Sequence, residues 1–256
     1  MGRFAHLDLR PETDARGTST VDWPDLDETR CMTTGDDHFN AGNYDAALTF
    51  YSRSLRFNRD LASAWVGQIR CLLALGEYRE AVTWTDRALD RFANTPDLLA
   101  CKGLALSRLG DPEGMSFLDS AIALKSAGPW VWLARGESLL LHKTAEANAN
   151  RCMLKALEMS GGDWRTELRI GIAYNTVGLN SKARGPLFSA VRSAPDNPLA
   201  LYHLGVAYQA LGEADAAAGC FSRAHGLGYK DASRALETLR ARGPVSRLLD
   251  SLWRKR

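Results

Sequence analysis

Apolar residues recur every three or four positions through most of the chain, which is the spacing of an amphipathic helix. The clearest example lies between Leu199 and Ala224, where two such stripes stand on either side of Gly212. The first stripe is Leu199, Leu201, Leu204, Tyr208 and Leu211, and the second is Ala216, Ala217, Cys220, Phe221 and Ala224. Because glycine readily adopts the left-handed backbone that ends many helices, this stretch predicts two helices joined at Gly212.

Small residues return at an interval of 34 residues or a multiple of it. The series are Gly35, Gly103, Gly171 and Gly205; Gly42, Gly76, Gly110, Gly178 and Gly212; Ala47, Ala81, Ala183 and Ala217; and Ala88, Ala190 and Ala224. A glycine inside a helix costs roughly 1 kcal/mol relative to alanine, so close packing must compensate for it. We therefore expect Gly205 and Ala217 to lie where the two helices of one hairpin cross.

The same period identifies the architecture. The two clearest units carry Ile170, Gly171, Tyr174, Ala183, Leu187, Ala190 and Pro195, and then Leu204, Gly205, Tyr208, Ala217, Phe221 and Ala224. This pattern resembles the tetratricopeptide repeat, a helical hairpin of 34 residues. The resemblance implies an all-α, right-handed superhelical solenoid of about six hairpins with a C-terminal capping helix pair. The expected units are residues 28–61, 62–95, 96–128, 129–163, 164–197 and 198–231.

Two features refine this prediction. The third unit lacks one residue between Gly110 and Ala121, and the fourth has one extra between Gly136 and Ala156. We expect their second helices to be shifted or irregular. Proline at a first helical position also marks three helix starts, after Thr95, Asp111 and Asn197, whose side chains are expected to cap the helices.

The ends of the chain lie outside the repeats. Residues 1–27 form an acidic leader, which is either flexible or folds back through Trp23 and Leu26, capping the first hairpin or occupying its groove. Residues 232–256 are expected to form capping helices with a basic end. The last apolar stripe is Val245, Leu248, Leu249, Leu252 and Trp253, and the basic residues around it are Arg247, Arg254, Lys255 and Arg256. That helix either caps the solenoid or docks on a partner or an anionic membrane surface.

Composition points to the cytoplasm. The five cysteines form no CxxC pair, which favours reduced thiols over a disulfide frame or a zinc site. No apolar run reaches the length of a transmembrane segment, and the start lacks the apolar core of a secretion signal.

We found no sequence motif for catalysis. The phosphate-binding loop, the zinc-protease motif, the serine-hydrolase elbow and the dinucleotide fingerprint are all missing, and the five histidines are scattered. The sequence therefore predicts no enzymatic activity, no catalytic residue, no metal site and no cofactor.

The family resemblance implies that the first helices of the hairpins line a concave groove that binds a partner. The groove residues that it implies are Phe39, Arg70, Leu73, Leu104, Arg108, Leu133, Glu137, Leu140, Leu168, Arg169, Ile172, Asn175, Tyr202, His203 and Gln209. This surface fits an extended or helical protein segment with aliphatic and acidic residues. Alternatively, its apolar residues pack between neighbouring first helices, and its arginines are only solvated. Met32, Asp36, Gly67, Asp97 and Cys101 stand where the chaperone carboxylate clamp has lysine, asparagine or arginine, so that subtype is not expected.

We therefore predict a non-catalytic protein–protein interaction module that acts as a scaffold, adaptor or assembly chaperone. The first alternative is a nucleic-acid-binding helical repeat, which a formal net charge of +2 and the lack of a basic or aromatic ladder disfavour. The second is a membrane-peripheral adaptor that uses the C-terminal basic helix.

Overall fold

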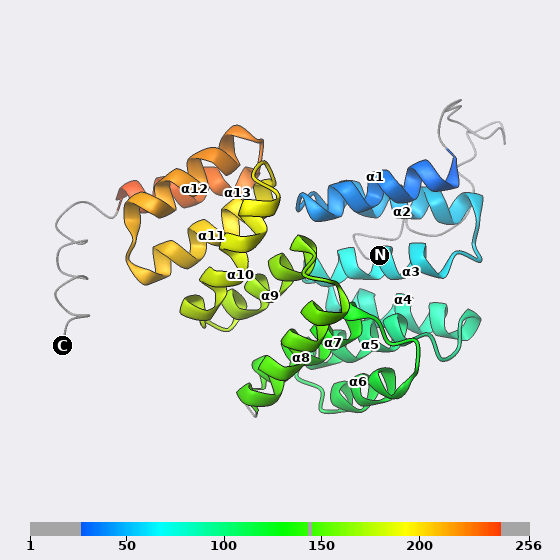
Figure 1. Ribbon diagram of the computed structural model, residues 1–256. Coiled ribbons are helices and arrows are strands. Elements are labelled where there is room, and N and C mark those ends of the chain that lie inside the picture. Colours follow the sequence, from blue (N-terminus) through cyan, green and yellow to red (C-terminus); the bar gives the residue numbers. More distant parts are fainter. Residues whose placement is uncertain (1–26, 143–144, 242–256) are drawn as a thin grey trace. The chain divides into compact units, whose positions relative to one another are not determined.

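The computed structural model describes residues 27–142 and 145–241, and these ranges hold thirteen α-helices and no strand (Figure 1). The helices are α1 (Glu28–Asn40), α2 (Tyr44–Phe57), α3 (Ala62–Ala74), α4 (Tyr78–Arg91), α5 (Pro96–Leu109), α6 (Glu113–Ala123), α7 (Pro129–Leu141), α8 (Glu146–Met159), α9 (Trp164–Thr176), α10 (Asn180–Ser193), α11 (Pro198–Leu211), α12 (Ala214–Gly226) and α13 (Lys230–Ala241). Each odd-numbered helix from α1 to α11 packs on the even-numbered helix that follows it. The predicted all-α solenoid of six helical hairpins is confirmed.

The chain divides between Leu124 and Lys125 into two compact units. In the first unit, α2 packs on α3 and α4 packs on α5, so that the first helices α1, α3 and α5 follow one another. In the second unit, α7, α9 and α11 follow one another in the same way, and α10 packs on α11. Each unit therefore has a face made by its first helices, which we call the first-helix face.

Glycines on the first helices admit large side chains from the second helices. A Cβ atom added at Gly205 would lie 2.6 Å from Cε1 of Phe221, closer than real Cβ atoms approach. Gly171 stands in the same relation to Leu187. The close crossing at Gly205 is confirmed, and the ring of Phe221 fills the space beside this glycine. Ala217 is fully buried in the same cluster as Phe221.

Tyr51 joins the first two repeats. Its ring would lie 2.9 Å from a Cβ at Gly35 on α1 and 2.6 Å from one at Gly67 on α3. The phenol also donates a hydrogen bond to Oδ1 of Asp36, with an O–O distance of 2.6 Å. The Tyr51 side chain therefore fills two gaps, one within its own hairpin and one between the first and second hairpins.

In the third repeat, the backbones of the two helices approach each other closely at Gly103 and Gly114. Its second helix, α6, has 11 residues, against 14 for α4. A Cβ at Gly114 would meet backbone atoms, with the carbonyl oxygen of Gly103 at 2.6 Å and the amide nitrogen of Ser107 at 2.8 Å. In the fourth repeat, α8 packs on α7 but makes little contact with α9. The two middle repeats are thus irregular, as expected from their lengths.

The side-chain cap predicted at Asn197 is present, and the one predicted at Thr95 is not. The side chain of Asn197 accepts a hydrogen bond from the amide of Ala200 at 2.8 Å, as predicted. The hydroxyl of Thr95 instead donates to the carbonyl oxygen of Phe92 at 2.9 Å and does not cap α5.

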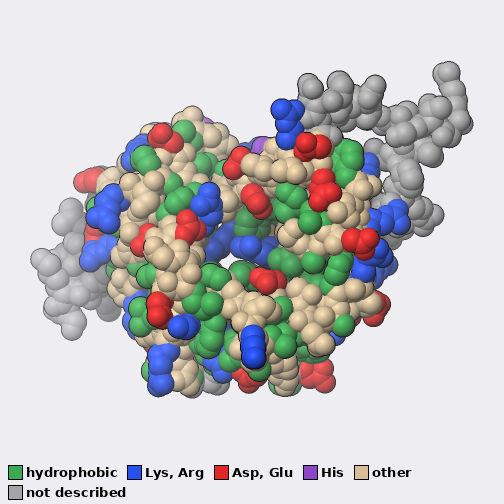
Figure 2. Space-filling model, turned by 45° about the vertical axis from the view of Figure 1, so that its right-hand side comes forward, with side chains coloured by type: hydrophobic (Ala, Val, Ile, Leu, Met, Phe, Trp, Pro, Cys, Tyr) green, Lys and Arg blue, Asp and Glu red, His purple; other side chains and the backbone are tan. Residues whose placement is uncertain are grey.

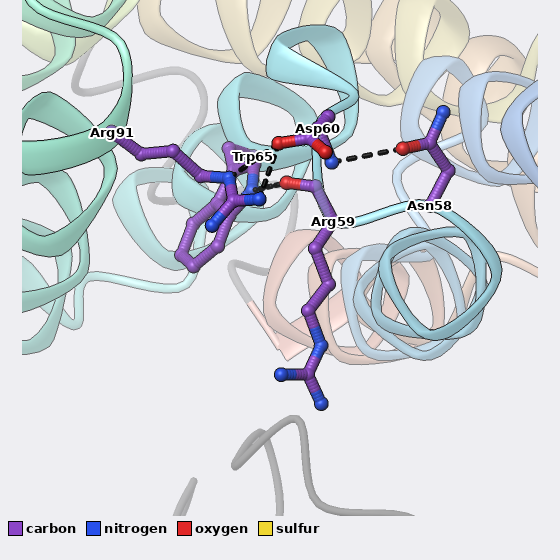
Figure 3. Close-up of polar contacts among 5 residues, drawn as sticks. All are labelled: Asn58, Arg59, Asp60, Trp65 and Arg91. Carbon is purple, nitrogen blue, oxygen red and sulfur yellow. Dashed lines mark hydrogen bonds and ion pairs between the residues drawn. The ribbon is translucent and has the colours of Figure 1, made fainter.

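The loop between α2 and α3 is held by α3 and α4 (Figure 3). Nε1 of Trp65 donates to the carbonyl oxygen of Arg59 at 3.0 Å, and Nε of Arg91 donates to Oδ1 of Asp60 at 2.7 Å. The amide of Asp60 donates to Oδ1 of Asn58 at 2.9 Å. Because the Arg91–Asp60 pair is largely exposed, it adds little stability, and the bond from the buried Trp65 fixes the loop more firmly.

The extra helix expected after the last repeat is α13. Ala232 and Leu239 of this helix are buried, and they pack against residues of α11 and α12 that include Leu201, Ala224 and Phe221. This helix therefore covers the apolar side of the last hairpin. The leader up to residue 26, with Trp23 and Leu26, and the apolar stripe at 245–253 lie outside the described residues.

Gln68 on α3 provides a stability prediction. Its side chain is fully buried, and within the described residues neither Oε1 nor Nε2 has a hydrogen-bond partner. A buried polar group without a partner costs about 1–3 kcal/mol. We expect Gln68→Leu to raise the free energy of unfolding by about that amount and Gln68→Glu to lower it, as measured by urea denaturation. If Gln68→Leu brings no gain, a buried water satisfies the amide and this interpretation is wrong.

Candidate protein-interaction surface

The repeat places equivalent residues on the first-helix face of each unit. In the second unit, Arg169 and His203 are 34 positions apart, as are Asn175 and Gln209, so that each pair has the same register on α9 and α11. The two helices are in contact. Side chains from neighbouring repeats therefore lie side by side on this face.

The structure corrects the apolar part of the predicted groove. Five of its residues are buried in the packing of their own unit, with exposed fractions of 6% or less. They are Phe39 (5%), Leu104 (3%), Leu133 (6%), Leu140 (4%) and Leu168 (1%). These side chains therefore offer almost no surface to a partner.

The other ten predicted residues are half-buried. They fall into two groups, Arg70, Leu73 and Arg108 on the first unit, and Glu137, Arg169, Ile172, Asn175, Tyr202, His203 and Gln209 on the second. Each unit thus carries some of the candidate residues on its own first-helix face, and the second unit carries most of them.

Arg70 lies at the centre of the first unit's face. Its guanidinium carbon is 4.7 Å from the centre of the Phe39 ring on α1, within the range of a cation–π contact. On α5, burial raises the pKa of the Asp97 carboxyl, and the positive charge of Arg70 counteracts this shift. Arg70 therefore interacts with both neighbouring first helices. The sequence analysis considered Asp97 only for the missing carboxylate clamp and did not count it among the groove residues.

Arg108 lies near the second hairpin. Its guanidinium carbon is 6.0 Å from the centre of the Tyr78 ring at the start of α4. Both arginines thus contact aromatic rings of their own unit.

The second unit's face is joined by a hydrogen bond between repeats. Nδ2 of Asn175 donates to the carbonyl oxygen of His203 at 2.9 Å. The ring of His203 packs edge-on against Tyr202, with 5.3 Å between the ring centres. Burial, and secondarily the positive charge of Arg169, lower the pKa of His203 to about 3, so the ring is neutral at physiological pH.

Large apolar side chains are also exposed on second helices. Leu154 on α8 is 66% exposed and Phe188 on α10 is 55% exposed. The sequence analysis missed both residues. The signal was the position of Phe188 directly after Leu187, because adjacent residues of a helix point in different directions and Leu187 is the core residue.

The distribution of charged and metal-binding side chains does not by itself mark out a further site on the described residues. Acidic and basic side chains are interspersed over the visible surface (Figure 2). No group of three or more metal-binding side chains gathers within the described residues. None of the described helices has the length and apolar character required to cross a bilayer. All five cysteines are free, and four of them are buried.

Comparison with known proteins supports the repeat assignment. The family model of the tetratricopeptide repeat matches residues 32–96 and 170–228. The comparison with curated proteins finds no match.

Solved structures share the fold at low sequence identity. A tetratricopeptide repeat protein from Parabacteroides merdae is 16% identical with a TM-score of 0.56, over 85% of this chain and 86% of that one. Human IFIT1, solved as a dimer with m7Gppp-AAAA, is 16% identical with a TM-score of 0.55, over 81% of this chain and 54% of that one. A chain of the APC/C hetero-tetramer Cut9-Hcn1 is 17% identical with a TM-score of 0.53, over 83% of this chain. The match spans only 42% of the length of that chain.

Proposed function

Because this chain belongs to the tetratricopeptide-repeat family, whose members are in general protein-interaction modules, we propose that it is a non-catalytic scaffold or adaptor that binds a partner segment on its first-helix faces. Assembly chaperoning is one use of such binding. The partner is another protein, and its bound segment carries aliphatic and acidic residues. We also propose that the protein works in the cytoplasm, since free, mostly buried cysteines suit a reducing compartment.

One observation carries this proposal. On the second unit, the first helices α9 and α11 carry the half-buried residues Arg169, Ile172, Tyr202 and Gln209. Apolar and aromatic side chains mixed with arginine are typical of surfaces that bind proteins. The positive charge of Arg169 adds a preference for acidic residues in the bound segment.

Nucleic acid is the competing ligand. IFIT1, which shares this fold, was solved with m7Gppp-AAAA, so the fold alone does not choose between a protein and a nucleic-acid ligand. The formal net charge of +2 favours the protein partner. A steep decrease of affinity with salt would favour nucleic acid, because phosphate contacts release counterions.

Charge reversal tests the proposal. We expect peptides selected from a random phage-displayed library on the full chain to be rich in aliphatic and acidic residues. They should bind the double variant Arg108→Glu, Arg169→Glu at least about tenfold more weakly, since reversed charges repel acidic segments. Fluorescence anisotropy with labelled peptides measures the affinities.

The matched control is Arg151→Glu, which reverses an exposed charge on α8, away from the first helices. It should leave peptide affinity within about twofold. Equal binding by the wild type, the double variant and the control would show that the first-helix faces do not bind the partner.

A further inference from the structure

Phe57 leaves an apolar surface open at the end of α2. Within the described residues of the first unit, Phe57 and Leu109 are the only exposed large apolar side chains, at 59% and 44%. Phe57 belongs to a stripe of α2 that also carries Phe50 and Arg53, because residues three or four positions apart share one side of a helix. Covering such a phenylalanine is favourable in proportion to the apolar area that leaves water.

This side chain lies near the point where the chain enters α1. The hydroxyl of Ser54 on α2 donates a hydrogen bond to the carbonyl oxygen of Glu28, the first residue of α1, at 3.5 Å. Phe57 stands one helical turn further along α2. The end of α2 is therefore beside the start of α1.

The electrostatics of the first turn agree with this placement. Oδ1 of Asp27 accepts a hydrogen bond from the amide of Arg30 at 2.8 Å and so caps α1. Burial raises the pKa of the Cys31 thiol, and the charges of Arg53 and Asp27 act on this pKa in opposite directions. Arg53 is thus close to the residue through which the leader joins the first helix.

The surface around Phe57 is basic. Arg53 and Arg56 lie four positions and one position before it on α2, and Arg59 follows in the loop. The guanidinium of Arg59 points away from the ion pair of this loop, and the carboxylate of Asp60 is already bound by an arginine of α4 (Figure 3). We call Phe57 and these three arginines the α2-end patch.

The sequence directly before α1 complements this patch. Residues 22–26 read Asp-Trp-Pro-Asp-Leu, so that two large apolar side chains alternate with two carboxylates. Residues 1–27 together hold six acidic side chains and three arginines, which gives a formal charge of −3. An acidic segment with apolar anchors therefore adjoins a basic surface with an exposed phenylalanine.

We propose that residues 22–26 dock on the α2-end patch of the same chain. Trp23 and Leu26 pack against Phe57, and the two carboxylates face the arginines. The connection is long enough, because the five residues from Trp23 to Glu28 span up to about 17 Å when extended. Phe57 stands only about 4.5 Å along the helix axis from the residue that contacts Glu28.

Pro24 supports this arrangement. Proline favours the polyproline II backbone, and it disfavours helical backbone at the residue before it, here Trp23. The polyproline II conformation returns every three residues, so Trp23 and Leu26 share one side of such a segment and Asp22 and Asp25 share another. The apolar side can then face the phenylalanine while the carboxylates lie toward the arginines.

This inference goes beyond the proposed function. The segment has the apolar and acidic composition expected of a partner, and docking on α2 keeps it away from the first-helix faces. The α2-end patch is thus a site for the chain's own leader, separate from the surface that binds the partner.

Fluorine NMR of the full-length protein labelled with 5-fluorotryptophan tests this docking. The resonance of Trp23 is assigned by its loss in Trp23→Phe and is compared with that of a synthetic peptide of residues 1–26 labelled in the same way. We expect the two positions to differ, since a neighbouring aromatic ring shifts the resonance, and Phe57→Ala should move the protein resonance toward the peptide position. The matched control, Leu109→Ala, removes the other exposed side chain of the unit and should leave the resonance in place.

Charge reversal tests the electrostatic part. The double variant Arg56→Glu, Arg59→Glu should also move the resonance toward the peptide position, since reversed charges repel the two aspartates. The control Arg79→Glu reverses an exposed charge on α4 and should have no such effect. The resonances of the buried Trp65 and Trp84, whose ring centres are 6.0 Å apart, show that each variant remains folded.

Three results would overturn the proposal. A wild-type Trp23 resonance at the peptide position would mean that the segment does not dock. A resonance that stays in place in Phe57→Ala would rule out this patch, and its movement in Arg70→Glu instead would put the segment on the first-helix face. A position that depends on protein concentration would show that the segment docks on a second copy. None of these results bears on the proposed function, which the peptide selection tests.

Discussion

Replacing Gly114 by alanine is expected to lower the free energy of unfolding by about 3 kcal/mol or more. The new Cβ atom would lie 2.6 Å from the carbonyl oxygen of Gly103 and 2.8 Å from the amide nitrogen of Ser107. Both are backbone atoms of α5, and they cannot turn aside as a side chain can. The helices α5 and α6 would have to separate, which would loosen the contact between Gly103 and Leu118 as well.

The matched control is Gly219→Ala in α12. A Cβ atom added there meets no atom within 4 Å. Alanine is the better helix former, so this variant should gain roughly 0.5–1 kcal/mol. Urea denaturation of both variants, followed by circular dichroism, measures the difference. Similar stabilities for Gly114→Ala and the wild type would mean that α5 and α6 do not cross so closely.

The stability of the protein should depend on pH through His203. The pKa of this side chain is about 3 in the folded protein, against an ordinary value of 6.5. Because the folded state disfavours the proton, the stabilising contribution is present above pH 6.5 and is lost as the pH falls toward 3. The loss approaches about 1.4 kcal/mol per pH unit within this window.

The variant His203→Leu isolates this effect from the titration of carboxylates. We expect the wild type to lose stability faster than the variant between pH 6.5 and 4, with a gap of a few kcal/mol at the acid end. Above pH 7 the two curves should run in parallel. Thermal denaturation at a series of pH values measures both, and parallel curves across the whole range would show that folding does not lower the pKa of His203.

The hairpins could be predicted because several of them place a glycine and a large apolar residue at a constant spacing. Gly171 with Leu187 and Gly205 with Phe221 are each 16 positions apart, and both pairs pack as the repeat requires. In the second repeat, Ile69 stands 34 positions after Gly35 and Thr85 stands 34 after Tyr51. The larger residue of the pair is therefore on the first helix in this repeat and the smaller one on the second, and both Ile69 and Thr85 are buried. The repeat thus conserves the filled volume more strictly than the residue types.

The sequence predicts which residues lie on the first-helix faces, but it does not predict which of them are exposed. Helix register places Phe39, Leu104 and Leu168 on the first-helix face, but it does not give the distance between neighbouring first helices. That distance decides whether a side chain is a contact surface or part of the core.

Tyr51 has a consequence for how the first unit loses its structure. Its ring occupies space against Gly35 in its own hairpin and against Gly67 in the next. When α1 and α2 unfold, the Tyr51 ring no longer packs against α3, and the surface of α3 around Gly67 becomes exposed. The first two repeats should therefore melt as one cooperative block, with no stable state in which only the first has frayed.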